Sequence, residues 1–326
     1  MDARDPHYVS GSESDVEYAH RPPKRVRRTP PLDRARTNGR NASSSSVLPP
    51  LSLSILGVEP LDEFIREVAD FIHHSITTRP SDLHGEIEVE AKIGVLRDRV
   101  TGNRLQLPVL VETILTPKAA DCHFESNMSQ AQHQHYNILL NKLKEASDKP
   151  GYHSSSIAYT HAHLVDSFYV SENPRDREKI RVTRNDKNGE VLSTVKKIRL
   201  GNLDVYSPKR AADWRISVNV EVPVPHPIGS PSYSRRKDRI SYAHEEFIID
   251  LTQVTSYSAP GSQPELLHEL ELEFANSQLL AAAAAKRGDE SFPESERSAF
   301  DELIRVFVNN ARILARNAEG GSAVTS

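Results

Sequence analysis

Two short stretches, GEIEVEAKIG (residues 85–94) and HELELEF (residues 268–274), alternate acidic and apolar residues with a period of two. Successive side chains of a β-strand point to opposite faces, so this period predicts strands with one acidic and one apolar face. The carboxylates that share a face are Glu86, Glu88 and Glu90 in the first stretch and Glu269, Glu271 and Glu273 in the second. Neighbouring like charges on one face repel, so such ladders are costly unless water or a cation neutralises them.

Other stretches between these two alternate in the same way but carry basic side chains. In EKIRVTR (residues 178–184), Arg181 shares a polar face with Lys179, and in SRRKDRISY (residues 234–242) the polar face carries Arg235, Lys237 and Arg239. In DWRISVNVEV (residues 213–222), one face of the predicted strand is polar and the other carries four branched apolar residues. In LSTVKKIRL (residues 192–200) the alternation is broken, which is compatible with a bulge and leaves the facing of its lysines open.

Taken together, these strands predict a mainly β, α+β fold in which an antiparallel sheet curls into a tunnel with a hydrophilic interior. A single strand with one charged face is usually the wet side of an ordinary sheet. Here nearly every strand pairs an apolar face with a densely charged one, so the apolar faces are expected to turn outward and pack on helices. The three- and four-residue spacing of apolar residues predicts those helices near residues 61–72, 130–146 and 300–314.

Carboxylates and cations that converge in one cavity suit a hard divalent cation and a polyphosphate. Mg²⁺ or Mn²⁺ takes oxygen ligands, and two or three glutamates suffice to hold it. Arg and Lys bind phosphate oxygens, and a bound metal offsets the charge that develops in an in-line displacement. Hydrolysis of a phosphoanhydride is the reaction that this residue set supports.

The ordered set of motifs resembles the fungal RNA 5′-triphosphatases, the β subunits of the mRNA-capping enzyme, within the triphosphate tunnel metalloenzymes. EIEVEAKIG matches the first glutamate-rich motif of that family and HELELEF matches the last, and the resemblance covers most of residues 57–317. The motifs that lie between and after them, in the family's order, are KIRVTR, VYSPK, DWRISVNVEVPVP, RRKDRISY, IDLTQV and LIRVFVNN. The resemblance implies an eight-stranded antiparallel tunnel, a homodimer, and metal-dependent removal of the γ-phosphate of nascent RNA. It also implies an RNA guanylyltransferase, the α subunit of the capping enzyme, as a partner.

The resemblance also implies roles for individual residues. The implied metal ligands are Glu88, Glu90 and Glu273, while Glu86 lies outside the match. The implied catalytic carboxylates are Glu221, which would position the nucleophile, and Glu269 and Glu271, which would support the metal-bound water and the basic side chains. The implied phosphate-binding residues are Arg181, Lys196, Arg235, Lys237 and Arg239, of which Arg181, Lys196 and Arg239 also count as catalytic. Asp250, Thr252 and Arg215 are expected to hold these catalytic and phosphate-binding side chains in position without contacting the substrate themselves.

The N-terminal region has a different composition from the rest of the chain. The chain has 326 residues with a formal net charge of −4, yet residues 21–40 carry eight basic side chains and one acidic one. Residues 1–50 are rich in Ser, Pro, Gly and Asn, a composition that cannot offset the entropy of ordering the backbone. We therefore expect a disordered basic tail over residues 1–46, a catalytic domain over 47–318 and a flexible C-terminus over 319–326.

Short motifs give expectations about location. The stretch PPKRVRR (residues 22–28) fits a nuclear-import tract, although solvated charge runs without a receptor are also common. The N-terminus lacks the apolar core of a secretory signal, the longest apolar runs are too short to span a membrane, and Cys122 is the only cysteine. We expect an intracellular, nuclear protein that does not contact a membrane.

Other site chemistries fit the sequence less well. The pairs HQH (residues 133–135) and HAH (residues 161–163) lack a third clustered donor for zinc, and no GxxxxGK[ST] phosphate loop occurs. Two alternatives to an RNA triphosphatase stay open: a tunnel enzyme that acts on another triphosphate, and a non-catalytic adapter that binds RNA ends or a capping partner.

Overall fold

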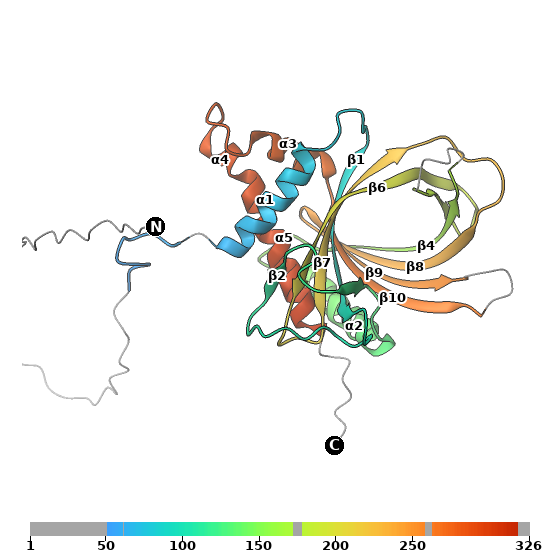
Figure 1. Ribbon diagram of the computed structural model, residues 1–326, viewed down its shortest axis with the longest axis horizontal. Coiled ribbons are helices and arrows are strands. Elements are labelled where there is room, and N and C mark those ends of the chain that lie inside the picture. The colour runs from blue at the N-terminus through green and yellow to red at the C-terminus, as the bar shows by residue number, and fades with distance from the viewer. Residues whose placement is uncertain (1–50, 61, 172–177, 258–262, 319–326) are drawn as a thin grey trace, which may run out of the picture. The chain divides into compact units, whose positions relative to one another are not determined.

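Eight antiparallel strands of the segment Pro60–Ser326 close into a barrel, which confirms the predicted tunnel fold (Figure 1). The barrel strands are β1 (Glu86–Asp98), β4 (Ala158–Tyr169), β5 (Ile180–Asn185), β6 (Val191–Tyr206), β7 (Asp213–Pro223), β8 (Tyr233–His244), β9 (Phe247–Ser256) and β10 (Glu265–Phe274). They follow one another around the ring in the order β10-β9-β8-β4-β5-β6-β7-β1, and pairing of β1 with β10 closes it. Closure leaves these strands without a free edge.

This computed structural model describes residues 51–60, 62–171, 178–257 and 263–318. The chain divides into Met1–Glu59 and Pro60–Ser326. In the first part, residues 51–59 form bends and turns in which the Ser54 hydroxyl donates to the carbonyl oxygen of Val58 at 2.6 Å. The tail expected over residues 1–46 and the C-terminus expected over 319–326 lie outside the described residues.

Two short strands pair with the C-terminal ends of barrel strands β6 and β1. β2 (Thr113–Leu115) pairs with β6, and β3 (Cys122–Glu125) pairs with the end of β1. The approach of β3 explains the glycine of the AKIG motif. A Cβ at Gly94 would lie 2.1 Å from the carbonyl oxygen of Glu125, so a larger residue there would push β3 away from β1.

The helices are α1 (Glu63–Thr77), α2 (Gln130–Ser147), α3 (Ser277–Lys286), α4 (Glu294–Arg297) and α5 (Ala299–Arg316). Their starts follow local capping chemistry: Asp62 accepts hydrogen bonds from the first turn of α1, and Ser129 forms a capping box with Gln132. The predicted helices near residues 61–72, 130–146 and 300–314 are therefore present. None of the described helices has both the length and the apolar character that crossing a membrane requires.

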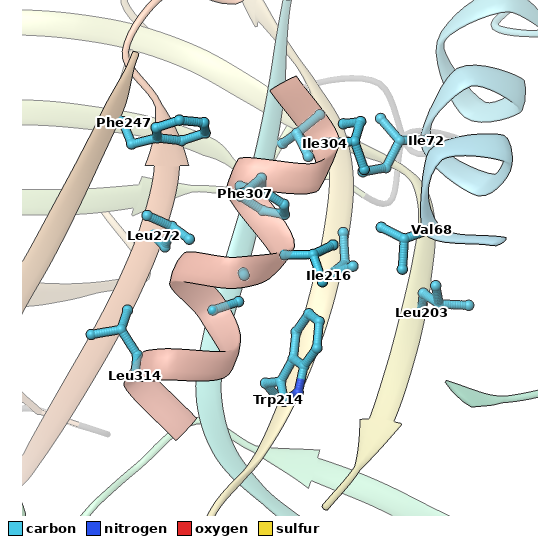
Figure 2. Close-up of a cluster of buried hydrophobic side chains, with 14 of the residues drawn as sticks. Val68, Ile72, Leu203, Trp214, Ile216, Phe247, Leu272, Ile304, Phe307 and Leu314 are labelled. Atoms are coloured by element: carbon cyan, nitrogen blue, oxygen red, sulfur yellow. The ribbon is translucent and has the colours of Figure 1, made fainter. Parts of the chain in front are cut away.

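Helices α1, α3 and α5 pack against the outer face of the barrel. Figure 2 shows α1 and α5 beside the apolar faces of the strands. Trp214 and Ile216 of β7, Phe307 and Ile304 of α5, and Ile72 of α1 belong to one apolar cluster, and all five side chains are fully buried. Burial of such side chains stabilises the fold by about 1.5–3 kcal/mol each. The apolar half of the alternation thus holds the barrel, and the polar half is left for its interior.

Candidate active site

The interior of the barrel is a cavity of about 470 Å³, called here the tunnel cavity, that is lined mainly by charged side chains. Its carboxylates are Glu88, Glu90, Asp166, Glu221, Glu269, Glu271 and Glu273, and its cations are Lys92, Arg181, Lys197, Arg199, Arg235, Lys237 and Arg239. The seven acids balance the seven bases. Charges this dense cost desolvation energy unless they pair with one another, so the pairing decides what the site can bind.

The three carboxylates expected to hold a metal lie next to one another. Glu90 of β1 is the direct cross-strand partner of Glu273 of β10, and Glu88 lies two residues along the same face. The Asn219 side chain of β7 donates to Glu88 at 3.0 Å and to Glu90 at 3.3 Å, which fixes both carboxylates. Lys197 forms an ion pair with each of these two glutamates.

Glu273 is the least compensated acid of the tunnel cavity. In the part of the chain that the structure describes, its carboxylate has neither a hydrogen bond nor an ion pair with a basic group. Burial, together with the nearby charges of Asp250 and Glu88, raises the pKa of Glu273 to about 8. Burial and the charge of Glu90 likewise raise the pKa of Glu88. This corner therefore has an excess of negative charge, which an oxygen-ligated divalent cation would neutralise.

Four basic side chains of the tunnel cavity each hold a carboxylate. The pairs and their N–O distances are Arg181 with Glu221 at 2.6 Å, Arg235 with Glu269 at 2.8 Å, Lys237 with Asp166 at 2.6 Å, and Arg239 with Asp250 at 2.9 Å. These pairs fix the cations in the tunnel before any ligand arrives. The structure thus brings Arg181, Arg235, Lys237 and Arg239 together as predicted, with Glu221 and Glu269 beside them.

Lys92 and Asp166 are two tunnel residues that the sequence did not single out. Lys92 forms ion pairs with Glu271 and with Glu90, and the second of these is 3.2 Å long. Burial opposes the charged form of Lys92, but Glu271 and Glu90 outweigh it and raise its pKa, while Lys92 in turn helps to lower the pKa of buried Glu271. Lys92 follows the acidic ladder on the same face of β1, so extending the alternation by one step could have found it.

The predicted phosphate-binding role of Lys196 is not supported by its position. Lys196 is aligned with Val222 and Ile180 on the neighbouring strands, does not line the tunnel cavity, and donates to the Ser171 hydroxyl at 3.4 Å. Its neighbour Lys197 enters the tunnel instead. The broken alternation does reflect an irregularity, because the register of β6 shifts between Arg199 and Gly201, but this shift comes after both lysines.

The three residues expected behind the site differ in their positions. Asp250 is buried, accepts a hydrogen bond from the Ser241 hydroxyl at 2.5 Å and forms an ion pair with Arg239, so it lies behind the tunnel cations. Thr252 is buried on the same strand, opposite Arg239 and Glu269. Arg215 does not reach this group. It pairs with Asp204 at 2.5 Å and lines a separate cavity.

The structure places a third potential metal ligand, which the sequence did not reveal, beside the two histidines of HAH. Asp238 of β8 lies next to His161 and His163 of β4, and the potential ligand atoms of the three lie within 4.8 Å of one another. The sequence-based argument that no third donor exists was therefore wrong. The three side chains are at least partly exposed and belong to the outer face, because they alternate with the tunnel residues of their strands.

Comparison with known proteins agrees with this geometry. The family model described as mRNA capping enzyme, beta chain, matches residues 58–320. A curated relative, the mRNA-capping enzyme subunit beta of Schizosaccharomyces pombe, is 36% identical over 85% of this chain and 88% of its own length. The solved structure of the S. pombe Pct1 RNA triphosphatase matches with a TM-score of 0.73 at 36% identity, covering 83% of this chain and 99% of that one. A second structure of Pct1, in complex with the Spt5 CTD, also has a TM-score of 0.73. The chain is a triphosphate tunnel protein and belongs to the family of mRNA-capping enzyme beta chains.

Proposed function

We propose that this protein is an RNA 5′-triphosphatase of an mRNA-capping apparatus, which removes the γ-phosphate of 5′-triphosphate RNA and leaves a 5′-diphosphate end. The observation that carries the proposal is the tunnel cavity itself. It combines a corner of three adjacent carboxylates, Glu88, Glu90 and Glu273, with a wall of fixed arginines and lysines. The likeness to a polynucleotide-processing family gives the substrate class, which charge alone does not specify.

The donor set fits a hard divalent cation, and we propose Mg²⁺ or Mn²⁺. Glu88, Glu90 and Glu273 offer only oxygen ligands, and burial together with the negative charges of Asp250 and Glu88 raises the pKa of Glu273 more than Arg239 lowers it. Bound there, such an ion would polarise phosphate oxygens and offset the negative charge that grows in the transition state.

The basic side chains bind and orient the triphosphate. Arg181, Arg235 and Arg239 present guanidinium forks to phosphate oxygens, and Lys237 acts as a point charge. Their carboxylate partners hold them in place, so little reorganisation is needed when the phosphates bind, and preorganised charge of this kind is effective because it is already oriented.

Glu221 is proposed to orient the attacking water. It lines the tunnel cavity and keeps one oxygen on Arg181, which leaves its second oxygen to accept a proton from water. The pairs formed by Glu269 and Glu271 keep Arg235 and Lys92 in position. Asp250 does the same for Arg239 from the neighbouring strand.

Phosphate release from RNA labelled at its γ-phosphate tests the proposal. The full chain with Mg²⁺ or Mn²⁺ should release the label from 5′-triphosphate RNA and leave 5′-diphosphate RNA, and chelation of the metal should stop the reaction. Binding of the RNA without release of phosphate would instead indicate an adapter. Faster turnover of a triphosphate that carries no RNA would indicate a different substrate.

Location and assembly are part of the same proposal. Nuclear location is proposed from the PPKRVRR stretch (residues 22–28), and deletion of this stretch in a fluorescent fusion should move the signal out of the nucleus. A homodimer and an RNA guanylyltransferase partner are proposed from membership of the capping beta-chain family. Light scattering on the purified chain tests the dimer, and co-purification with the guanylyltransferase tests the partner.

A further inference from the structure

A second cavity of about 490 Å³ adjoins the tunnel cavity and shares lining residues with it. We call it the mouth cavity; it is lined by Phe168, Glu178, Lys179, Arg181, Lys197, Arg199, Asn219 and Tyr233. Phe168, Arg181, Lys197 and Arg199 line both spaces. A ligand whose phosphates occupy the tunnel would therefore place the group attached to those phosphates in the mouth cavity.

Two aromatic rings form one wall of the mouth cavity. Phe168 of β4 and Tyr233 of β8 are direct cross-strand partners, with ring centroids 4.5 Å apart and an interplanar angle of 9°. Both side chains are half-buried, and the ammonium of Lys179 lies 4.4 Å from the centroid of the Tyr233 ring. Flat, partly exposed aromatic surfaces of this kind stack nucleic-acid bases, whatever the sequence, because every base has a π-face.

The cations of the mouth cavity fall into two groups. Arg181 and Lys197 are already paired with tunnel glutamates. Lys179 and Arg199 are exposed, and neither forms an ion pair with the carboxylates that the structure describes. Two cations without acidic partners beside an aromatic wall combine the two features that bind single-stranded nucleic acid, a stacking surface and a positive path for the backbone.

We propose that the mouth cavity binds the first nucleoside of the RNA, with its base stacked on the Phe168–Tyr233 pair. Lys179 and Arg199 then contact the phosphodiester that leads to the second nucleotide. This inference rests on the proposed function, because it names how the same site recognises RNA rather than a bare polyphosphate. On this proposal, the preference for an RNA end comes from Phe168 and Tyr233, which are separate from the arginines and lysines that bind the triphosphate.

The test compares a substrate that has a nucleoside with a competitor that has none. For Phe168→Ala, the KM for 5′-triphosphate RNA should rise about tenfold, by the usual effect of losing one stacked base, while the inhibition constant of inorganic triphosphate changes by less than about twofold. Phe168→Leu keeps an apolar side chain without a ring and should behave like the alanine variant, whereas Phe168→Trp should keep a KM close to that of the unmodified chain. Tyr159→Ala is the matched control, because it removes a partly exposed aromatic residue of the same strand that lines neither cavity.

A fluorescence measurement reports on stacking directly. RNA that carries 2-aminopurine as its first base should lose fluorescence on binding to the unmodified chain and should keep it on binding to Phe168→Leu. An equal change in the RNA and inorganic-triphosphate constants of Phe168→Leu, or equal quenching by both proteins, would overturn this inference alone. Failure of the unmodified chain to release phosphate from RNA would overturn the proposed function as well.

Discussion

The inner and outer faces of the barrel strands are built from neighbouring residues and serve opposite purposes. Val89 and Glu90 are consecutive in β1 and almost equally buried, at 2% and 4% exposure. Val89 belongs to the apolar core outside the barrel, whereas Glu90 is surrounded by Lys92, Lys197 and Asn219 within it. Burial alone therefore says little about a residue's contribution, because the outer face supplies stability and the inner face supplies binding and chemistry.

The two faces contribute differently to stability, because folding removes apolar side chains from water on one face and charged side chains from water on the other. Apolar side chains on the outer face lose contact with water, which contributes about 25 cal/mol per Å². Charged side chains on the inner face lose hydration, and their mutual attraction only partly restores it. Substitutions on the outer face should therefore lower the free energy of unfolding and leave kcat unchanged. Substitutions on the inner face should lower kcat and cost little stability.

The largest expected effect is on activity, from Glu273→Gln on the inner face. Loss of one carboxylate from the corner with Glu88 and Glu90 should lower kcat by about three orders of magnitude, because it removes one of the three ligands of the proposed metal, which would offset charge in the transition state. Burial raises the pKa of Glu273 to about 8, so the neutral amide should also raise the free energy of unfolding, by about 1 kcal/mol. Phosphate release and thermal unfolding measure the two effects.

Glu265→Gln is the matched control for that variant, because Glu265 lies on β10 with the same parity as Glu273 but does not line the tunnel cavity. It should leave turnover within about twofold of the unmodified chain, as expected for a surface substitution. Near-normal turnover of Glu273→Gln would remove Glu273 from the site.

The outer face gives the largest expected effect on stability. Phe307→Ala in α5 removes a fully buried ring that stacks on Phe274 with centroids 4.9 Å apart. The loss of burial and the remaining cavity should lower the free energy of unfolding by about 4 kcal/mol. Denaturant titration measures this change, and kcat of the fraction that stays folded should remain near normal. A large fall in kcat without loss of stability would mean that the two faces are not separable.

Arg236 and Arg239 are close together in β8 but lie on opposite faces of the strand, so their substitution compares the effects of the two faces on kcat. Arg239→Ala on the inner face should lower kcat about a hundredfold, because it removes a proposed phosphate ligand and leaves buried Asp250 without its ion-pair partner. Arg236→Ala on the outer face breaks only an exposed pair with Asp186 and should change kcat by less than about twofold. Steady-state kinetics on both variants, prepared in parallel, decides whether the direction of the side chain or simply the loss of charge matters.

Lys196 and Lys197 are adjacent in β6 and lie on opposite faces of the strand, so they allow the same comparison of kcat. Lys197→Ala removes the cation between Glu88 and Glu90 and should lower kcat by about tenfold or more. Lys196→Ala alters the opposite face of the strand and should leave kcat within about twofold. The reverse order of effects would restore the original expectation for Lys196 and would require a different register for β6.

These two lysines also show how far the sequence could be read. Period-two alternation was sufficient to place Glu88, Glu90 and Glu273 on the inner face, because a regular strand fixes the facing of every side chain. Near the irregularity of β6 the alternation is broken, so the local pattern left the facing of the lysines open, and Lys196 was named from the family resemblance alone. The structure aligns Ile198 with buried Val220 on the next strand, and Lys197 lines the tunnel cavity.

Contacts between distant strands could not be predicted in this way. The register that sets Glu90 opposite Glu273 depends on closure of the ring by β1 and β10, which no single stretch encodes. Likewise, the third donor beside His161 and His163 comes from Asp238, which is 77 positions from His161 in the sequence. A pattern within one strand gives the direction of a side chain, but only the fold gives its neighbours.

The smallest expected effect concerns pH and a histidine on the outer side of the barrel. Burial and the nearby His268 lower the pKa of His133 of α2 to about 4, and the two rings lie 4.8 Å apart. His133 is neutral in the folded chain but binds a proton in the unfolded chain below its ordinary pKa of about 6.5. Stability should therefore fall as the pH decreases from about 6.5 to about 4.

The full shift would correspond to about 3 kcal/mol, and screening at this partly exposed ring should reduce it to about 1 kcal/mol. His133→Leu removes the titrating group, so its free energy of unfolding should decrease less between pH 7 and pH 5 than that of the unmodified chain. Urea titrations at a series of pH values measure both slopes. Identical slopes would mean that His133 stays accessible to protons in the folded state. In that case, the packing of α2 against β9 and β10 would be looser than the apolar outer face requires.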